Sequence, residues 1–374
     1  MRLTLSSAVL ASRLNTLSKV LNSKNSLQIL DCFLFEVNDG TLTLTASDKE
    51  NEMKTTIQLD EADADGRFAI SSRMIIDAVK ELPEQPITLE IDTTTYSVKL
   101  IYQNGDYNFT AQNADEFPQA QKVQQDANAI NISSELLLDN ITRTIFATAN
   151  EEIRPVMNGI YFDLNNEALA IVASDGHKLV RNKVFANKSE NPAAFILPKK
   201  PANLLKNVLT RDDSNVEIRF DSMNAEIVFS FGTLTTRLIE GRYPNYASVI
   251  PTNNPCQLTI DRKTLIGSLR RVLPFASESS QLVRLRLSMG MLEVSSEDID
   301  FYTSAKENIV CDYASNPMSI GFKGTSLMDI LNNLNSEEVI LELADPSRPC
   351  IILPAEQPEG QDVLMLIMPM LLND

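Results

Sequence analysis

Residues on which enzyme and metal chemistry depends are scarce in this sequence. Its 374 residues include no tryptophan, one histidine, four cysteines and twelve glycines. A single histidine excludes the common metal sites built from several imidazoles. The glycines form neither a phosphate-binding loop nor a dinucleotide fingerprint, and no acidic cluster has the spacing of a magnesium or two-metal site. The sequence therefore predicts no enzyme activity, no cofactor and no metal.

Paired cysteines and long apolar runs are missing as well. Cys32, Cys256, Cys311 and Cys350 include no Cys-x-x-Cys pair, which argues against a disulfide framework or a zinc knuckle and predicts reduced, mostly buried thiols. No apolar run approaches the ~20 residues that cross a bilayer, and the N-terminus lacks the plan of a signal peptide. We expect a cytoplasmic protein.

A threefold repeat is the main positive feature. Leucines with helical spacing open three segments, and their anchors Leu10, Leu137 and Leu265 lie 127 and 128 residues apart. A turn and an alternating strand follow each segment, and these strands end in Ser47-Asp48, Ser174-Asp175 and Ser296-Glu297. A second helix then follows in every copy. The six predicted helices cover residues 6–21, 72–82, 133–149, 199–209, 261–273 and 325–334.

A period near 125 residues is too long for a solenoid and indicates duplication of a whole domain. Candidate linkers occur at 118–129 and 251–255. The sequence therefore predicts an α+β protein of three domains, 1–120, 129–250 and 256–374, each with two helices packed on antiparallel sheets.

Charge is divided unevenly between the helices and the rest of the chain. The net charge is −17, yet the helical segments, counted with their flanking residues, hold 13 Lys and Arg against 6 Asp and Glu. The remainder therefore carries −24. Basic helices on an acidic chain could hold a polyanion against one surface through its phosphates, without reading sequence. Ordinary solvated helix faces remain the alternative.

The single histidine lies in the run Ser174-Asp175-Gly176-His177-Lys178. A triad compressed into four residues could not align its groups, so a tight turn is the favoured interpretation. A hydrolase or nucleotide-using enzyme centred on Asp175 and His177 is the alternative. The apolar, Met-rich end at 364–372 predicts either a buried terminal strand or a peptide-binding cleft, because thioethers repack around different partners.

Taken together, these motifs resemble the bacterial sliding clamp, the beta subunit of DNA polymerase III, over the whole chain. The most specific matches are Thr41 to Thr45 with Asp48, Asn158-Gly159, Ser174 to Leu179, Gly241-Arg242-Tyr243-Pro244-Asn245-Tyr246, and Met368-Pro369-Met370. The resemblance implies a DNA polymerase processivity factor: a head-to-tail homodimeric ring whose twelve helices surround duplex DNA.

Helix width agrees with two chains per ring. Twelve helices about 10 Å wide leave roughly 28 Å clear, whereas six leave about 9 Å, less than the roughly 16 Å that the two groove depths of a duplex add up to. The resemblance implies the following DNA-facing residues: Lys24, Arg73, Lys80, Arg154, Lys199 and Lys200.

The resemblance also implies a pocket that receives linear peptides from the polymerase III catalytic subunit, the clamp loader and repair proteins. Its expected lining is Met157, Ser174, Gly176, His177, Lys178, Leu179, Pro244, Ser248, Val249, Leu366, Met368, Pro369 and Met370. At the expected dimer contact, Tyr107 and Phe109 meet Pro274 and Phe275 of a second copy.

Three positions depart from the family pattern. Lys178 and Ser248 stand where the best-known members have Arg, and Leu371 replaces an Arg after Met-Pro-Met. These changes predict a less basic pocket. A multidomain adaptor that never encircles DNA remains a further alternative.

Overall fold

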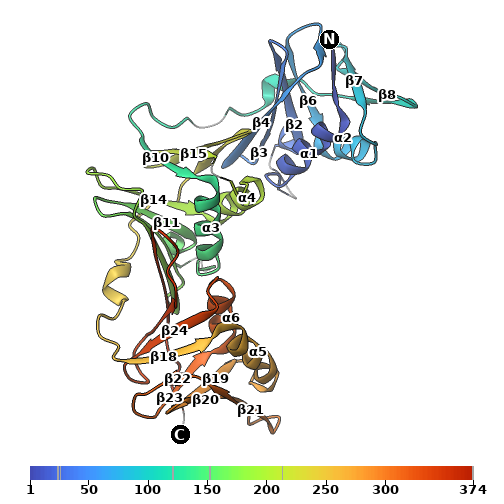
Figure 1. The fold of residues 1–374 in the computed structure, drawn as a ribbon. Coiled ribbons are helices and arrows are strands. Elements are labelled where there is room, and N and C mark those ends of the chain that lie inside the picture. Colours follow the sequence, from blue (N-terminus) through green and yellow to red (C-terminus); the bar gives the residue numbers. More distant parts are fainter. Residues whose placement is uncertain (23–24, 26, 120–121, 151–152, 213, 373–374) are drawn as a thin grey trace. The chain divides into compact units, whose positions relative to one another are not determined.

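The computed structural model describes residues 1–22, 25, 27–119, 122–150, 153–212 and 214–372 (Figure 1). The chain divides into two compact units. Unit 1 comprises Met1–Leu138 and Lys200–Leu238, and unit 2 comprises Asp139–Lys199 and Ile239–Asp374. Within the described residues, no helix is long and apolar enough to span a membrane.

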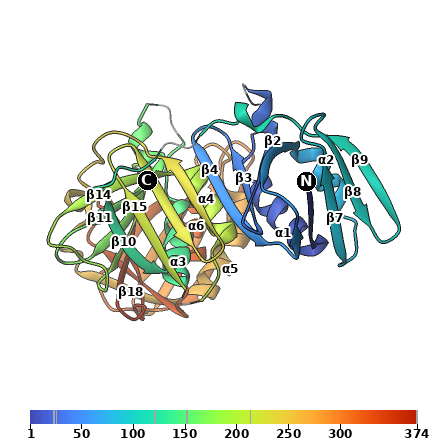
Figure 2. The ribbon, with the colours of Figure 1, turned by 90° about the horizontal axis from the view of Figure 1, so that it is seen from above.

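Unit 1 contains two antiparallel sheets. The first has the order β5-β1-β7-β8-β9, and Figure 2 shows β7, β8 and β9 side by side with β9 at the rim. Its strands are β1 (Arg2–Ser6), β5 (Glu61–Ala62), β7 (Pro86–Ile91), β8 (Ser97–Tyr102) and β9 (Gly105–Thr110). The second has the order β10-β15-β16-β17-β4-β3-β2-β6. Its strands are β2 (Cys32–Asn38), β3 (Thr41–Ser47), β4 (Asn51–Gln58), β6 (Gly66–Ser71), β10 (Asn128–Ser133), β15 (Asn215–Phe220), β16 (Asn224–Phe229) and β17 (Gly232–Arg237).

Helices α1 (Ser7–Ser18) and α2 (Ser72–Val79) pack against each other in unit 1 (Figure 1). The Ser6 hydroxyl caps α1 by accepting from the Val9 amide at 3.3 Å. Leucines at helical spacing, Leu10, Leu14 and Leu17, are fully buried beneath it. This apolar stripe fixes which face of α1 is turned away from solvent.

Unit 2 also contains two antiparallel sheets. The larger has the order β14-β11-β12-β13-β26-β25-β24-β18-β22. Its strands are β11 (Gly159–Leu164), β12 (Leu169–Ser174), β13 (Lys178–Val184), β14 (Ala193–Pro198), β18 (Cys256–Asp261), β22 (Asp312–Tyr313), β24 (Glu338–Leu343), β25 (Cys350–Pro354) and β26 (Gln361–Ile367). The smaller has the order β21-β20-β19-β23, from β19 (Leu282–Ser288), β20 (Met291–Asp298), β21 (Thr303–Val310) and β23 (Met318–Lys323).

Helices α5 (Arg262–Val272) and α6 (Gly324–Asn332) pack together in unit 2, and α5 covers β20 and β21. The carboxylate of Asp261 caps α5 by accepting from the Thr264 amide at 2.7 Å. The remaining helices are α3 (Ser134–Ile145) and α4 (Lys199–Val208). The boundary between the units crosses both of them.

The six predicted helices are confirmed, although each ends earlier than predicted. Helix α2 shows the reason, because it stops at Val79 instead of Leu82. The Leu82 amide donates to the Val79 carbonyl in a tighter final turn, and Pro83 disfavours a helical conformation at the residue before it. Cys32 and Cys350 are buried as predicted, whereas Cys256 and Cys311 are half-buried; all four are free thiols.

In the second hairpin of each repeat, the first strand leads into a turn that an aspartate carboxylate holds, called here the carboxylate turn. Strands β3, β12 and β20 lead into β4, β13 and β21. The predicted end of the third strand, Ser296-Glu297, is corrected: β20 runs on through Asp298, which pairs with Thr303. Asp298 is thus the third-copy counterpart of Asp48 and Asp175. Its turn is two residues longer than the other two.

Two sheets continue from one repeat into the next. Strand β17 pairs with β4 in unit 1, with Leu234 opposite Met53. Strand β26 pairs with β13 in unit 2, with Met365 opposite Val180. Within the described part of the chain, β9 and β21 each pair on one side only and form sheet edges.

Candidate functional site

A cavity of about 340 Å³ opens in unit 2, where β13, the segment 243–249 and the end of β26 meet. Its lining is Arg154, Met157, Ser174, Gly176, His177, Lys178, Leu179, Tyr243, Pro244, Asn245, Tyr246, Val249, Leu366 and Met368. All predicted pocket residues are brought together here except Ser248, Pro369 and Met370. Four lining residues were not among those predicted for the pocket: Arg154, which was predicted to face DNA, and Tyr243, Asn245 and Tyr246.

One wall of the cavity is the turn between β12 and β13. Gly176 has a φ of +89°, which glycine adopts without strain. One oxygen of Asp175 accepts from the amides of His177 and Lys178 at 2.8 and 2.9 Å. The other accepts from Nζ of Lys178 at 2.6 Å. This carboxylate therefore holds the turn through the His177 backbone and does not orient the imidazole as a triad carboxylate would.

Opposing effects act on the Asp175 carboxyl. Burial raises its pKa, but the hydrogen bonds from Lys178 and His177, with the charge of Lys178, outweigh burial and leave the pKa below its ordinary value. The group is ionised at neutral pH. The Lys178 ammonium is consequently drawn into the turn, and its side chain is only 12% exposed.

The interior of the cavity is apolar and its mouth carries flexible side chains. Met157, Leu179 and Leu366 are buried, whereas Val249 and Met368 are 51% and 39% exposed. Exposed apolar groups of this kind commonly mark a site for another molecule. The Met368 amide donates to the His177 carbonyl at 2.8 Å, which ties the C-terminal segment to the turn.

Two tyrosines support the wall formed by the segment 243–249. The ring of Tyr243 stacks on Tyr161 with centroids 4.6 Å apart. The hydroxyl of Tyr246 donates to a carboxylate oxygen of Asp163 at 2.9 Å. Burial raises the pKa of Tyr243 and outweighs an opposing hydrogen bond with the Ser174 backbone. Burial and then the Asp163 carboxylate raise the pKa of Tyr246, so both rings stay neutral. The motif Gly241 to Tyr246 was the sequence signal that could have assigned them to the pocket.

The three predicted residues outside the lining have other contacts. The Ser248 hydroxyl donates to the Asn245 carbonyl at 2.7 Å. Pro369 is half-buried, and the Met370 amide donates to the Gly321 carbonyl on β23 at 2.8 Å. The chain after Met368 is therefore attached to the smaller sheet of unit 2.

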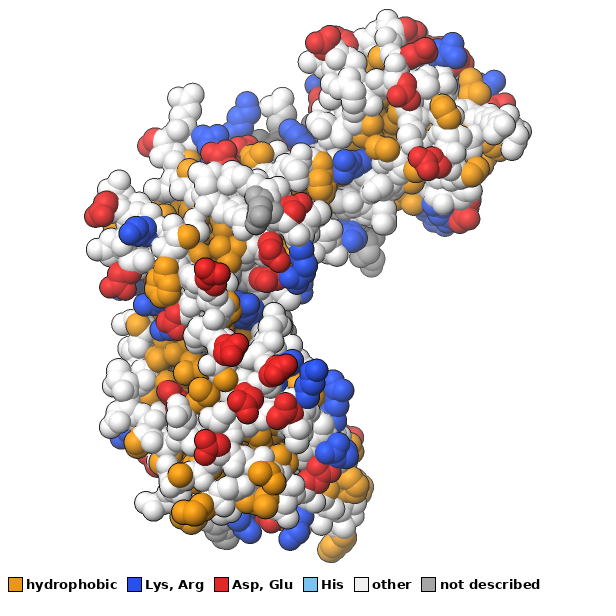
Figure 3. Space-filling model, viewed as in Figure 1, with side chains coloured by type: hydrophobic (Ala, Val, Ile, Leu, Met, Phe, Trp, Pro, Cys, Tyr) orange, Lys and Arg blue, Asp and Glu red, His pale blue; other side chains and the backbone are white. Residues whose placement is uncertain are grey.

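The residues predicted to face DNA have different surroundings. Arg73 is open to solvent, with its side chain 93% exposed. Lys80 donates to Asp77 at 2.7 Å; that hydrogen bond and the charge of Lys80 lower the pKa of Asp77, and the same bond raises the pKa of Lys80. Lys24 lies outside the described residues. Figure 3 shows further Lys and Arg side chains over α5, which carries Arg262, Lys263, Arg270 and Arg271.

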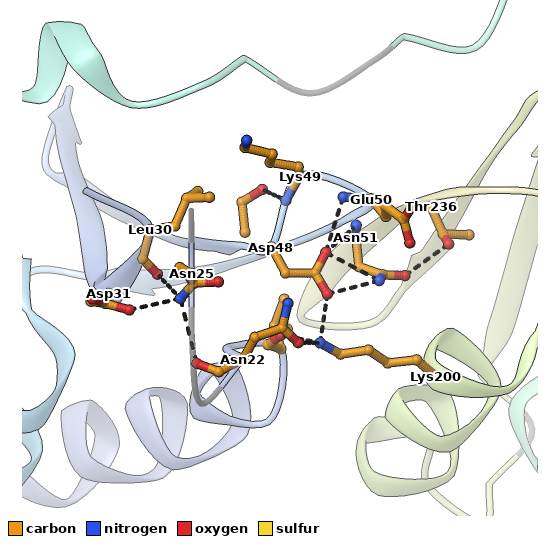
Figure 4. Close-up of polar contacts among 12 residues, drawn as sticks. Asn22, Asn25, Leu30, Asp31, Asp48, Lys49, Glu50, Asn51, Lys200 and Thr236 are labelled. Atoms are coloured by element: carbon orange, nitrogen blue, oxygen red, sulfur yellow. Dashed lines mark hydrogen bonds and ion pairs between the residues drawn. The ribbon is translucent and has the colours of Figure 1, made fainter. Parts of the chain in front are cut away.

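The two lysines that open α4 are engaged by the protein itself. Nζ of Lys199 donates to the Ala149 carbonyl at 2.9 Å and to Asn150, and burial, then the charge of Lys178, lowers its pKa. Nζ of Lys200 donates to the Val20 carbonyl and to Asn22, each at 2.6 Å, and to Asp48 at 2.5 Å (Figure 4). The side chain of Asp48 is only 4% exposed. Lys200 thus neutralises a buried carboxylate.

The predicted dimer-contact residues lie at two exposed places. Tyr107 and Phe109 are on the edge strand β9, and Tyr107 is 37% exposed. Pro274 and Phe275 belong to the short helix η5 (Leu273–Phe275) that follows α5, and Phe275 is 40% exposed.

Family models cover nearly the whole chain in order. The N-terminal, central and C-terminal domains of the DNA polymerase III beta subunit match residues 1–121, 131–245 and 247–371. The chain belongs to the DNA polymerase III beta subunit family, the bacterial beta sliding clamps. As a member of this family it is a processivity factor of DNA polymerase III, and the family is non-catalytic. The predicted family, function and lack of enzyme activity are thereby confirmed.

Individual relatives agree over their full length. The beta sliding clamp of Pseudomonas aeruginosa is 27% identical over 373 residues, which is 99% of this chain and 100% of that protein. A crystal structure of the Pseudomonas aeruginosa clamp bound to griselimycin covers 100% of both chains with a TM-score of 0.94 and 25% identity. A crystal structure of the Thermotoga maritima beta subunit has a TM-score of 0.89 and 26% identity, again over 100% of both chains. The predicted three-domain clamp fold is confirmed.

Proposed function

We propose that two copies of this sliding clamp close head-to-tail into a ring around duplex DNA. The cavity in unit 2 then receives linear peptides from the polymerase III catalytic subunit, the clamp loader and other clamp-binding proteins. We take 1–120, 129–250 and 256–374 as the domain boundaries, which the spans of the three family models support. Because the duplex it serves is the bacterial chromosome, we place the protein in the cytoplasm.

The observation that carries the ring is an unmatched pair of sheet edges. Each junction within the chain joins the strand after a carboxylate turn to the last strand of the next repeat, as in β4 with β17 and β13 with β26. By the same rule β21 should join the last strand of a following first repeat, which is β9 of a second copy. Two such contacts close two chains into a ring and leave neither edge exposed.

Internal equivalence also predicts the pairing register at that contact. Tyr107, Leu234 and Met365 hold equivalent places in the last strands of the three repeats. In their own hairpins they face Leu100, Ile227 and Ile352, respectively. Met53, Val180 and Ala305 hold equivalent places in the strands that follow the carboxylate turns, where they face Ala46, Ala173 and Ser296, respectively. Since Leu234 pairs with Met53 and Met365 with Val180, Tyr107 should lie opposite Ala305 of the second copy. Phe109 should then lie opposite Thr303, with Pro274 and Phe275 close to the contact.

The DNA contact we propose is to phosphate and carries no sequence information. The exposure of Arg73 on α2 and of Lys80 directly after that helix supports this role best. We keep Lys24, Arg154, Lys199 and Lys200 as candidates. The internal hydrogen bonds of Lys199 and Lys200 leave each less free to contact a phosphate.

The peptide role of the cavity is supported by its chemistry. Its buried Met157, Leu179 and Leu366 suit an apolar anchor, and the movable thioether of Met368 at the mouth suits anchors of different shape. The polar wall is the turn held by Asp175, in which Lys178 is already paired. A hydrophobic peptide with few acidic groups is therefore the preferred ligand.

Cross-linking on circular DNA tests the ring and its register together. We would replace Cys256 and Cys311 by serine and introduce Tyr107→Cys with Ala305→Cys. Opposite residues of antiparallel strands lie about 4.5–5.5 Å apart, which a disulfide spans. Oxidation should give two-chain rings that stay on nicked circular DNA in denaturant and leave it after linearisation.

The matched control pairs Tyr107→Cys with Thr303→Cys, whose positions are diagonal at about 7–8 Å in the predicted register. It should cross-link poorly. Equal cross-linking of the two designs would contradict the register. Equal retention on circular and linear DNA would refute encirclement and favour an adaptor.

A further inference from the structure

The three repeats share one polar feature, an aspartate carboxylate that holds the turn between β3 and β4, between β12 and β13, or between β20 and β21. One oxygen of Asp48 accepts from the amides of Glu50 and Asn51 at 3.0 and 2.7 Å. Asp175 does the same for His177 and Lys178. Asp298 does so for Asp300 and Phe301 at 3.0 and 3.2 Å. The three turns therefore occupy equivalent places in three copies of one structure.

The first two carboxylates each have one cation, but from different places. Asp48 is paired at 2.5 Å with Lys200, the second residue of α4 in the following repeat. Asp175 is paired at 2.6 Å with Lys178, which closes its own turn. The residue that closes the Asp48 turn is the uncharged Asn51, and the second residue of α6 is the uncharged Thr325. Each junction thus holds one carboxylate and one cation.

The third carboxylate has no cation partner among the described residues. Asp298 is 8% exposed, and no Lys or Arg of the described residues pairs with it. Thr303, which closes its turn, is uncharged. A buried carboxylate without a counter-charge is costly. The remaining position is the second residue of the corresponding helix in the next repeat.

That position is Arg73 of a second copy. Helices α2, α4 and α6 each begin directly after β6, β14 and β23, so Arg73, Lys200 and Thr325 are equivalent. The Arg73 side chain is 93% exposed, and its one acidic neighbour among the described residues is Asp77 at 3.9 Å, beyond hydrogen-bond range. An unpaired buried anion and a nearly free cation therefore occupy the two halves of the same junction.

A backbone bond repeats in the same way. The Arg237 amide donates to the Glu50 carbonyl, and the Met368 amide donates to the His177 carbonyl, both at 2.8 Å. The equivalent donor in the first repeat is the Thr110 amide. It points to the open edge of β9, because the next amide along, Ala111, donates inward to Tyr96. The equivalent acceptor is the Tyr302 carbonyl, just before Thr303.

Large apolar side chains are exposed to solvent at the tip of the third turn. Its two extra residues make a hairpin end on which Ile299, Phe301 and Tyr302 are 77%, 77% and 95% exposed. Three large apolar side chains on one turn are a surface that another molecule covers. Because this surface adjoins the Tyr302 carbonyl, which is the expected acceptor for the Thr110 amide, it should lie against the end of β9 in a second copy.

We infer that Asp298 pairs with Arg73 of a second copy across the subunit contact, beside an apolar cap formed by Ile299, Phe301 and Tyr302 on the end of β9. The inference rests on the head-to-tail ring of the proposed function and names the ion pair that fastens it. Arg73 is then an interface residue whatever it contributes to DNA binding.

A mixing experiment without DNA tests the pair. In Arg73→Glu dimers both contacts oppose two carboxylates, and in Asp298→Arg dimers both oppose two cations. A mixed dimer of the two variants instead has one reversed pair and one native pair. The dissociation constant of each variant alone should rise about a hundredfold, roughly tenfold for each of two contacts, and the mixed dimer should recover most of this loss. Sedimentation and fluorescence-based subunit exchange measure both.

Two controls separate the possible failures. Lys80→Glu changes an exposed cation directly after the same helix and should leave dimerisation unchanged. If Asp298→Arg disturbs its own turn, a double-mutant cycle of Arg73→Gln and Asp298→Asn replaces it, because asparagine keeps the acceptor that holds the turn. In this cycle the double variant should dimerise no more weakly than either single variant. Native-like dimers in both single variants, or additive losses in the cycle, would overturn the ion pair. A monomeric parent chain would instead refute the ring.

Discussion

Lys200 should stabilise unit 1 by neutralising Asp48, and its removal should open that unit locally. Figure 4 shows Lys200 reaching Asp48 and Asn22 together. Asn22 is joined to Asn25, whose amide nitrogen donates at 2.7 Å to Asp31, the neighbour of Cys32. Loss of the ammonium therefore affects both the carboxylate turn and the segment that ends at Cys32.

The size of the effect follows from exposure and from the bonds that remain. Breaking a fully buried pair costs about 3–5 kcal/mol. The Lys200 side chain is 35% exposed, so solvent reduces this figure. Asp48 also keeps its bonds from Glu50 and Asn51. We expect Lys200→Met to cost about 2 kcal/mol, a rise of roughly thirtyfold in the population of the open form.

Two native thiols allow this to be measured one unit at a time. Cys32 in unit 1 is 1% exposed, and burial followed by the charge of Asp31 raises its pKa to about 11. Cys350 in unit 2 is fully buried, and burial followed by the charge of Glu342 raises its pKa. Both react with a thiol reagent only after opening. With Cys256 and Cys311 replaced by serine, the two labelling rates report on separate units.

Lys200→Met should accelerate labelling of Cys32 about thirtyfold and leave Cys350 unchanged. Asp48→Asn removes the negative charge and keeps a hydrogen-bond acceptor. In the double variant Lys200→Met with Asp48→Asn, Cys32 should therefore be labelled more slowly than the sum of the two single effects predicts. An unchanged Cys32 rate would refute the role of the pair. An equal rise at Cys350 would show that the whole chain had been destabilised.

Two further predictions concern the cavity. Met368→Ala should weaken binding of a hydrophobic clamp-binding peptide about tenfold in fluorescence anisotropy, since the Met368 thioether closes the mouth of the cavity. The control Met289→Ala alters an 80% exposed methionine on another turn and should have no effect. Equal affinities of the two variants would show that the peptide does not bind at this cavity. Because the pKa of Asp175 is lowered in the folded state, its stabilisation of the turn is present above the ordinary carboxyl pKa and is lost as the pH falls through the lowered one. Peptide affinity should therefore stay constant down to about pH 4 and fall below it, and Asp175→Asn should bind more weakly at neutral pH with a flatter profile; a loss between pH 7 and 5 would contradict this.

Much of the fold could be predicted because the repeat presents the same pattern three times. Apolar residues at helical spacing, such as Leu10, Leu14 and Leu17, decide which face is buried whatever surrounds them. Element ends were less predictable. They depend on single hydrogen bonds, such as that from the Leu82 amide to Val79, which leave no periodic signal.

The cavity was largely predictable because its residues lie in a few short motifs. The use of individual lysines was not. Lys200 and Lys80 look alike in the sequence, as cations on amphipathic helices, yet one neutralises a buried carboxylate and the other pairs with an exposed one. The difference is set by Asp48, which is 152 residues away along the chain. Only the folded arrangement brings such partners together.

Where the cation of each junction comes from determines how that junction can separate. At the first two junctions both partners belong to one chain, so their separation is limited by the covalent connection and the effective concentration of the cation stays high. At the third junction of the proposed ring, Asp298 depends on Arg73 of another molecule, and separation disperses the two groups. In the proposed ring, the energetic difference between the two contacts within each chain and the contact between chains can thus arise from which molecule supplies one positive charge, with no change in the strand pairing that all three contacts share.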